Sequence, residues 1–193
     1  MAVNWIFFDQ TLRLRSGWRF AVFCVAFVFA AMIIGVAVAV LLSSLSVPLE
    51  PGSATYFLAN SSPMLVPAML VGWLCGKYLE ALPFRALGAS FTKGWLRHLL
   101  AGILFGAGTV SVAVLIAFVF GGLRFESNVI DGRMLAGSLT IAFMVFAVGA
   151  AAEEALFRGY ILQTFARSGF AALAIALTAV FFGIVHSRNP NVG

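Results

Sequence analysis

Long apolar runs constrain the fold of this sequence more than any other feature. Residues 20–42 and 99–120 contain no charged side chain, and 62% of the chain is hydrophobic. About 20 apolar residues in a helix cross the roughly 30 Å hydrocarbon core of a bilayer, whereas strands of a membrane barrel alternate in polarity. The sequence therefore predicts an all-α, polytopic transmembrane helical bundle.

Five helices are expected within one integral membrane domain that covers residues 1–193. N-terminal membrane helices occupy residues 1–133, and a helical hairpin occupies residues 134–193. The second helix contains Pro63 and Pro67, so a kinked or partly re-entrant segment is an alternative there. The first run is too long for the apolar region of a signal peptide, so we expect it to stay as an anchor. The predicted helices are residues 20–42, 58–74, 96–120, 134–167 and 170–186.

Basic residues are concentrated before the first helix and between the second and third helices. The positive-inside rule then places the N-terminus in the cytoplasm, in a multi-pass protein of the inner (plasma) membrane. The net charge of +5 follows from this topology and from anionic lipid headgroups, so the bilayer is an expected partner and nucleic acid is not. The residues concerned are Arg13, Arg15, Arg19, Lys77, Arg85, Lys93 and Arg97.

The two cysteines and one of the two histidines give no sign of a site. Cys24 and Cys75 are far apart in sequence and lie in or beside apolar helices, which favours small buried side chains over a disulfide or a metal site. His98 stands at the start of the third predicted helix, where an interfacial role is expected.

Charged residues interrupt the fourth apolar run, where the sequence reads AAEEALFRGY. Ionisable groups in membrane helices are costly and usually face the bundle interior in pairs. Glu154 and Arg158 have the i, i+4 spacing of an ion pair on one helical face. Glu153 lies about 100° around the helix from Glu154, so this pair does not satisfy it. Glu153 is therefore a candidate general base.

A histidine on the next helix is expected to reach the same depth as Glu153. Glu153 lies 15 residues before the Ser168-Gly169 turn and His186 lies 17 residues after it. At 1.5 Å per residue these distances are about 22 and 25 Å along an antiparallel hairpin. The register predicts one shared site. The alternative is a solvated helix extension carrying the glutamates and an interfacial His186.

The two motifs resemble those of a known family. EEALFR is similar to the E-E-x-x-x-R motif, and FGIVH, residues 182–186, to the F-x-x-x-H motif, of the CPBP intramembrane endopeptidases. These include type II CAAX prenyl proteases and bacteriocin-processing or bacteriocin-immunity proteins. The resemblance covers residues 134–191. It implies that Glu153 activates a water, His186 assists, Glu154 and Arg158 order the site, and Phe182 packs beside the catalytic groups.

The resemblance leaves the need for a metal open. Both metal-dependent and glutamate-only mechanisms have been described for the family, so the expected cofactor is none or zinc, with Glu153 and His186 as its ligands. One histidine with carboxylates is short of a three-ligand zinc site, and H-E-x-x-H is missing. Asn189 and Asn191 are expected to be helix-end or loop residues.

The family pattern continues beyond this sequence with a second histidine on a later helix. We therefore expect the 193 residues to be the N-terminal part of a larger bundle, the alternative being a shortened relative without activity. Alone, they are expected to bind little or no catalytic metal and to show no peptidase activity.

Three classes of function are compatible with these residues. The first is an endopeptidase that cleaves a prenylated C-terminal peptide, a leader peptide or a membrane-protein segment. The second is a scaffold or immunity protein of the same lineage without catalysis. A transporter or channel component that uses the charged residues as a proton relay is the third.

Overall fold

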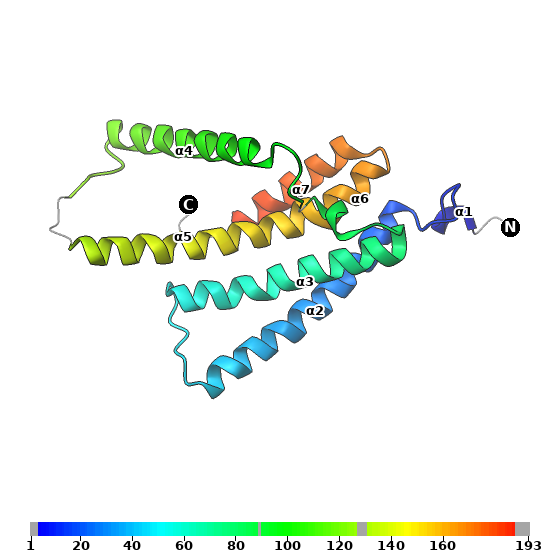
Figure 1. The fold of residues 1–193 in the computed structure, drawn as a ribbon, viewed down its shortest axis with the longest axis horizontal. Helices are drawn as coiled ribbons and strands as arrows, with labels where there is room; N and C mark the ends of the chain where they lie inside the picture. The colour runs from blue at the N-terminus through cyan, green and yellow to red at the C-terminus, as the bar shows by residue number, and fades with distance from the viewer. Residues whose placement is uncertain (1–3, 89, 127–130, 188–193) are drawn as a thin grey trace. The chain divides into compact units, whose positions relative to one another are not determined.

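A computed structural model describes residues 4–88, 90–126 and 131–187, and its described part is helical without strands. Asn189 and Asn191 lie outside the described residues. The all-α prediction is confirmed (Figure 1). In chain order the elements are α1 (Asn4–Phe7), α2 (Ser16–Ser44), α3 (Ala54–Glu80), the 3₁₀ turn η1 (Phe84–Leu87), α4 (Trp95–Val119), α5 (Gly132–Glu154), the π-helical turn η2 (Ala155–Ile161), α6 (Leu162–Arg167) and α7 (Ala171–His186).

Within the described residues, four helical segments are long and apolar enough to cross a membrane. They are α2, α3, α4 and the continuous segment Gly132–Arg167, which contains α5, η2 and α6. The fifth predicted helix is present as α7, with 16 residues. Its predicted beginning, residue 170, is one residue before the observed Ala171. The prediction of a polytopic helical bundle is therefore confirmed.

The α3 helix is longer and more regular than the sequence predicts. It runs for 27 residues through Pro63 and Pro67, so the predicted span 58–74 is too short at both ends and the re-entrant alternative is wrong. Proline has no N–H to donate to the carbonyl four residues before it. At Pro63 that carbonyl belongs to Ala59, and it accepts a hydrogen bond from Ser62 Oγ at 3.3 Å. The serine compensates for the missing donor.

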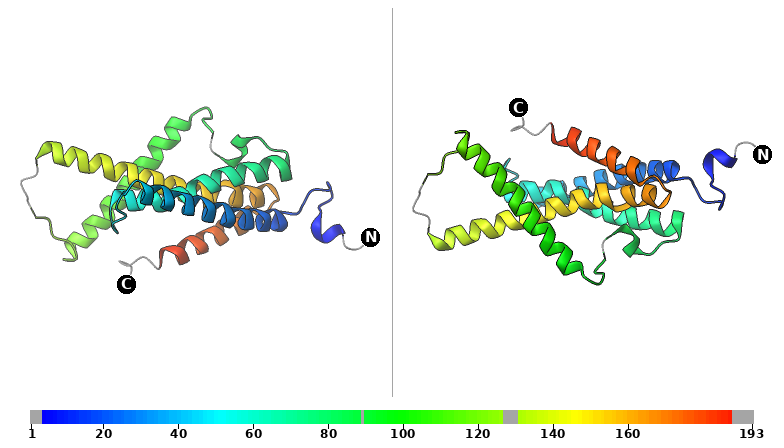
Figure 2. Two further views of the ribbon diagram at one scale, coloured as in Figure 1. Left: turned by 90° about the horizontal axis from the view of Figure 1, so that it is seen from below. Right: turned by 90° about the horizontal axis from the view of Figure 1, so that it is seen from above.

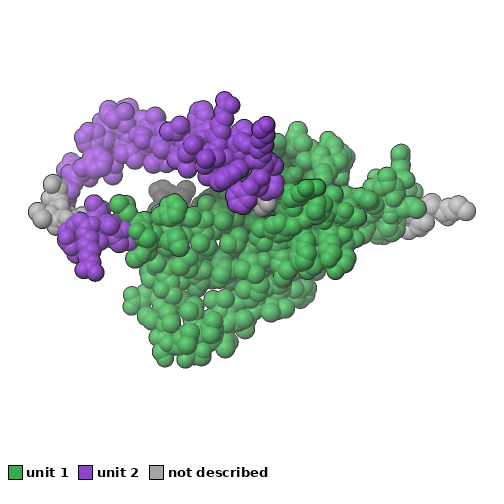
Figure 3. Space-filling model, viewed as in Figure 1, with its two compact units in different colours: residues 1–89, 138–193 green, residues 90–137 purple. Residues whose placement is uncertain are grey.

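The chain divides into two compact units, which Figure 3 colours separately. Residues 90–137 form one unit, which contains α4 and the beginning of α5. The α4 helix is apolar over most of its length, as expected of a helix that spans a membrane. Residues 1–89 and 138–193 form the other unit, which contains both sequence motifs.

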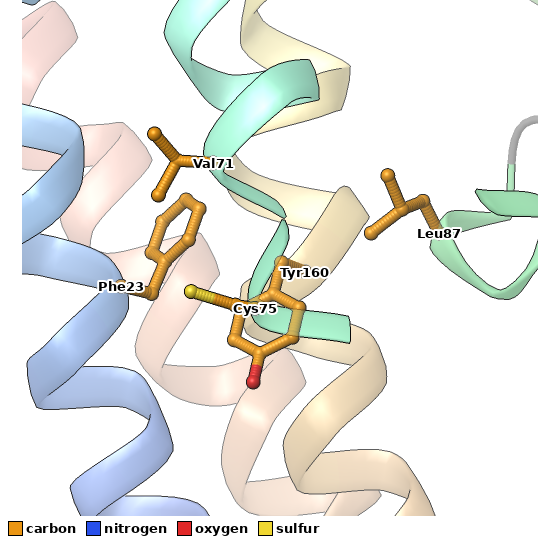
Figure 4. Close-up of a cluster of buried hydrophobic side chains, with 5 residues drawn as sticks. All are labelled: Phe23, Val71, Cys75, Leu87 and Tyr160. Atoms are coloured by element: carbon orange, nitrogen blue, oxygen red, sulfur yellow. The ribbon is translucent and has the colours of Figure 1, made fainter. Parts of the chain in front are cut away.

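The larger unit is built on the helix pair α2 and α3, which packs against η2, while α6 and α7 form a hairpin (Figure 2). Its core cluster consists of buried side chains from α2, α3, η1 and η2 (Figure 4). Tyr160 of η2 is fully buried there, with its ring centroid 5.2 Å from that of Phe23. A Cβ at Gly72 would lie 3.3 Å from Tyr160 Cβ, so glycine allows this close approach. The cluster members are Phe23, Val71, Cys75, Leu87 and Tyr160.

A buried ion network joins the ends of three helices in this unit. Glu80, at the end of α3, is 4% exposed and pairs with Arg19 of α2 at 3.1 Å. Arg167, at the end of α6, donates to both carboxylate oxygens of Glu80, at 3.0 and 3.1 Å. This two-point contact is the geometry in which arginine binds carboxylate best. The network holds the beginning of α2 against the ends of α3 and α6.

Candidate active site

The two adjacent glutamates occupy the last positions of α5, directly before the π-helical turn. Gly159 within η2 has ψ −115°, outside the helical range, so the predicted helix 134–167 is kinked at this point. A π turn adds a residue to the helical repeat and is common at functional sites. Burial of Tyr160 in the core fixes the orientation of this turn relative to α3. The glutamates thus lie directly before an irregular segment whose Tyr160 is buried in the core.

Glu153 and His186 lie in contact across the helical hairpin. Glu153 Oε1 is 3.4 Å from His186 Nε2, and the two side chains are 37% and 36% exposed. The antiparallel register predicts this meeting, because the two residues lie at nearly equal distances from the turn at Gly169, whose φ is +85°. One carboxylate and one imidazole therefore share a half-buried position on neighbouring helices.

The hydrogen bond on the other side of the imidazole defines its tautomer. His186 Nδ1 lies 2.9 Å from the backbone oxygen of Phe182, which can only accept, so Nδ1 carries the proton. Nε2 then faces Glu153 with a lone pair unless a further proton is present. The contact between Nε2 and Oε1 is favourable when one proton lies between them.

Two aromatic rings support the histidine. The Phe182 ring stacks on the His186 ring with a centroid distance of 4.0 Å, and the edge of Phe157 meets Phe182 at 5.6 Å. Phe182 is a motif residue that the sequence identifies. Phe157 was not identified, although its i, i+4 spacing from Glu153 places it on the same helical face.

Glu154 and Arg158 form the predicted ion pair, with Glu154 Oε2 and Arg158 Nη1 2.9 Å apart. Their side chains are 60% and 68% exposed, so the pair is open rather than buried. It lines a cavity of about 430 Å³ that also contains Glu153 and Phe182. The remaining lining residues are Ala150, Phe157, Leu162, Ile175, Thr178 and Ala179. The cavity combines carboxylates and a guanidinium with apolar walls.

The described residues do not fit a catalytic zinc site. Among residues 4–88, 90–126 and 131–187, no group of three His, Cys, Asp or Glu side chains is placed to hold a metal ion. Glu153 and His186 would supply two ligands, whereas catalytic zinc takes three from the protein. No chemical step is therefore assigned to a metal here.

Cross-linking tests the hairpin register. With Cys24 and Cys75 replaced by alanine, the pair Glu153→Cys and His186→Cys is expected to be joined efficiently by a short thiol cross-linker. The control pair is Glu153→Cys with Ile184→Cys, because Ile184 lies two residues before His186 and about 200° around α7. Equal cross-linking of both pairs, or none at position 186, contradicts the observed contact.

One comparison with known proteins matches the segment that contains Glu153 and His186. Residues 135–193 match the family model of Rce1-like type II CAAX prenyl endopeptidases. This segment includes both motifs and confirms the family resemblance that they indicate. No curated protein and no solved structure matches the chain. Together with the long apolar helices, the family match identifies an integral membrane protein.

Proposed function

We propose that the protein is an intramembrane endopeptidase in which Glu153 and His186 act together on a water molecule. The observation that carries this proposal is the 3.4 Å contact between Glu153 Oε1 and His186 Nε2, beside a cavity of about 430 Å³. The family match over residues 135–193 supports peptide hydrolysis as the reaction. A solvated helix end would not require the two residues to meet.

In the proposed reaction Glu153 removes a proton from water, and the oxygen attacks the carbonyl carbon of the scissile bond. The tetrahedral intermediate collapses with cleavage of the C–N bond, and the proton passes to the leaving amine. His186 contacts the Glu153 carboxylate through Nε2 and shares the proton that Glu153 takes from water. Glu154 and Arg158 fix the surrounding helical turn, and the Phe182 ring keeps the imidazole in place.

The surroundings of the pair support a class of substrate. The apolar walls of the cavity suit a peptide that is held at the membrane. A prenylated C-terminal peptide, a leader peptide and a membrane-protein segment are peptides of this kind. The basic end of the bundle supports an inner (plasma) membrane protein with a cytoplasmic N-terminus.

A peptide panel tests the proposal. Membranes that contain the protein expressed from its complete coding sequence are incubated with one peptide of each of the three classes. We expect one internal cleavage, with two products whose masses sum to the substrate plus one water. A wild-type protein that cleaves no member and instead moves protons across vesicles would contradict peptidase function and favour a relay.

The aromatic support of His186 is expected to contribute measurably to the rate. Phe182→Ala should lower kcat/KM about threefold to tenfold, because an aromatic pair is worth about 0.5–1.5 kcal/mol. Phe181→Ala is the matched control, since Phe181 is its sequence neighbour, is 54% exposed and does not line the cavity. Equal losses in both variants would show that Phe182 has no special role in positioning the histidine.

A further inference from the structure

A second cavity, of about 800 Å³, lies where α2 begins and where α3 and α6 end. Its charged lining consists of four arginines and two carboxylates, and the first residues of α2 complete one wall. None of these groups belongs to the Glu153–His186 pair. The charged residues are Asp9, Arg13, Arg15, Arg19, Glu80 and Arg167.

The cavity carries an excess of positive charge. Hydrogen bonds from the Thr11 hydroxyl and from the Arg13 backbone lower the pKa of Asp9, so it is an anion at neutral pH. Glu80 is also paired as a carboxylate, with Arg19 and Arg167. Arginine keeps its charge at any physiological pH. Four cations therefore face two anions.

A few hydrogen-bond donors of the cavity lining have no partner among the described residues. The side chain of Arg19 is 7% exposed, and its Nε has no hydrogen-bond partner among the described residues. The α2 helix begins at Ser16 without a side-chain cap and without an acidic residue in its first turn. The first amides of a helix are free donors and carry a partial positive charge. A buried guanidinium and an uncapped helix thus adjoin one cavity.

We propose that this cavity binds the phosphate of an anionic membrane lipid headgroup. Phosphate oxygens accept hydrogen bonds from arginine forks and from helix N-termini, which are the two kinds of donor present. The basic residues at this end of the bundle also favour the leaflet that is rich in anionic lipid.

Aromatic side chains beside the cavity favour a lipid over a free phosphate ion. Trp5 and Trp18 are 63% and 41% exposed, and Trp18 stacks on Phe7 at 4.9 Å. Trp18 also lines the cavity. Exposed tryptophans are typical of the headgroup level of a bilayer. A bound headgroup there would be continuous with acyl chains that run along the apolar surface of α2.

Binding is measured by titrating the full chain in neutral detergent micelles with phosphatidylglycerol or phosphatidylcholine, using native mass spectrometry. We expect phosphatidylglycerol to bind at least about tenfold more tightly than phosphatidylcholine. Gly17→Glu is expected to weaken its binding at least tenfold. A Cβ at Gly17 meets no atom within 4 Å, so the new carboxylate can compete for the arginines without a clash. An acidic residue in the first helical turn also favours folding.

Arg15→Gln is the second variant, and we expect it to weaken the binding of phosphatidylglycerol threefold to tenfold. Arg85→Gln is its matched control, because it removes the same charge from η1, outside the cavity lining. Losses of the same size in Arg15→Gln and Arg85→Gln, or no preference for phosphatidylglycerol, would overturn the proposal. Competition by inorganic phosphate at low millimolar concentration would support the phosphate chemistry but assign the site to a soluble ion. If inorganic phosphate does not displace the bound phosphatidylglycerol, the result supports a site for the lipid headgroup.

Discussion

Replacing Glu153 by glutamine is expected to lower the rate of peptide cleavage by at least about 100-fold. A positioned general base contributes about 10²- to 10⁴-fold, and glutamine keeps the size of the side chain but cannot take a proton from water. The measurement is the initial rate for whichever panel peptide the wild-type protein cleaves, normalised to the amount of protein in the membrane.

Glu126→Gln is the control for this substitution. Glu126 is exposed and lies in the unit of residues 90–137, away from both motifs in sequence, so the same chemical change should leave the rate within about twofold. Retention of cleavage in Glu153→Gln would exclude this carboxylate as the base. A cellular phenotype that survives Glu153→Gln unchanged would favour the scaffold alternative.

Replacing Glu80 by glutamine is expected to lower the free energy of unfolding by about 3–5 kcal/mol. The change leaves Arg167 without its counter-charge and Arg19 with Asp9 alone, at 3.4 Å. Glu80 is 4% exposed, and loss of one partner of a buried ion pair has an effect of this size. Unfolding in mixed micelles of increasing denaturing-detergent content can be followed by the reactivity of Cys75, which is buried in the core cluster.

Glu154→Gln provides the comparison for stability. It removes the same charge from an exposed pair, so a change of at most about 1 kcal/mol is expected. If Glu80→Gln and Glu154→Gln destabilise the protein equally, the buried network has no particular structural role. A loss of activity in Glu80→Gln without a loss of stability would instead indicate an effect transmitted along α6.

The features predicted from the sequence depend on length and on register. Apolar runs of about 20 residues define the spanning helices, and the turn between residues 167 and 171 sets Glu153 opposite His186. Both are local properties of the chain, so a single sequence specifies them. The catalytic roles of Glu153, Glu154, Arg158, Phe182 and His186 stay predictions.

Features that depend on packing between distant segments were not predicted. The π turn at Ala155–Ile161 is stabilised by Tyr160, which packs against α2 and α3, and nothing within the EEALFR motif indicates it. The unbroken course of α3 through Pro63 depends partly on one hydrogen bond from Ser62. The Glu80 network could have been suspected, because a lone carboxylate at the end of an apolar helix requires a cation. Its partners, 61 and 87 residues away, could not be chosen from spacing.

A double-mutant cycle on cleavage measures whether Glu153 and His186 act as one catalytic pair. The rates of wild type, Glu153→Gln, His186→Gln and the double variant are compared on the same peptide. Residues that act as a unit are strongly non-additive, so the double variant should be within about threefold of Glu153→Gln alone. A double variant whose loss equals the product of the two single losses would show that the residues act independently, contrary to the proposed mechanism.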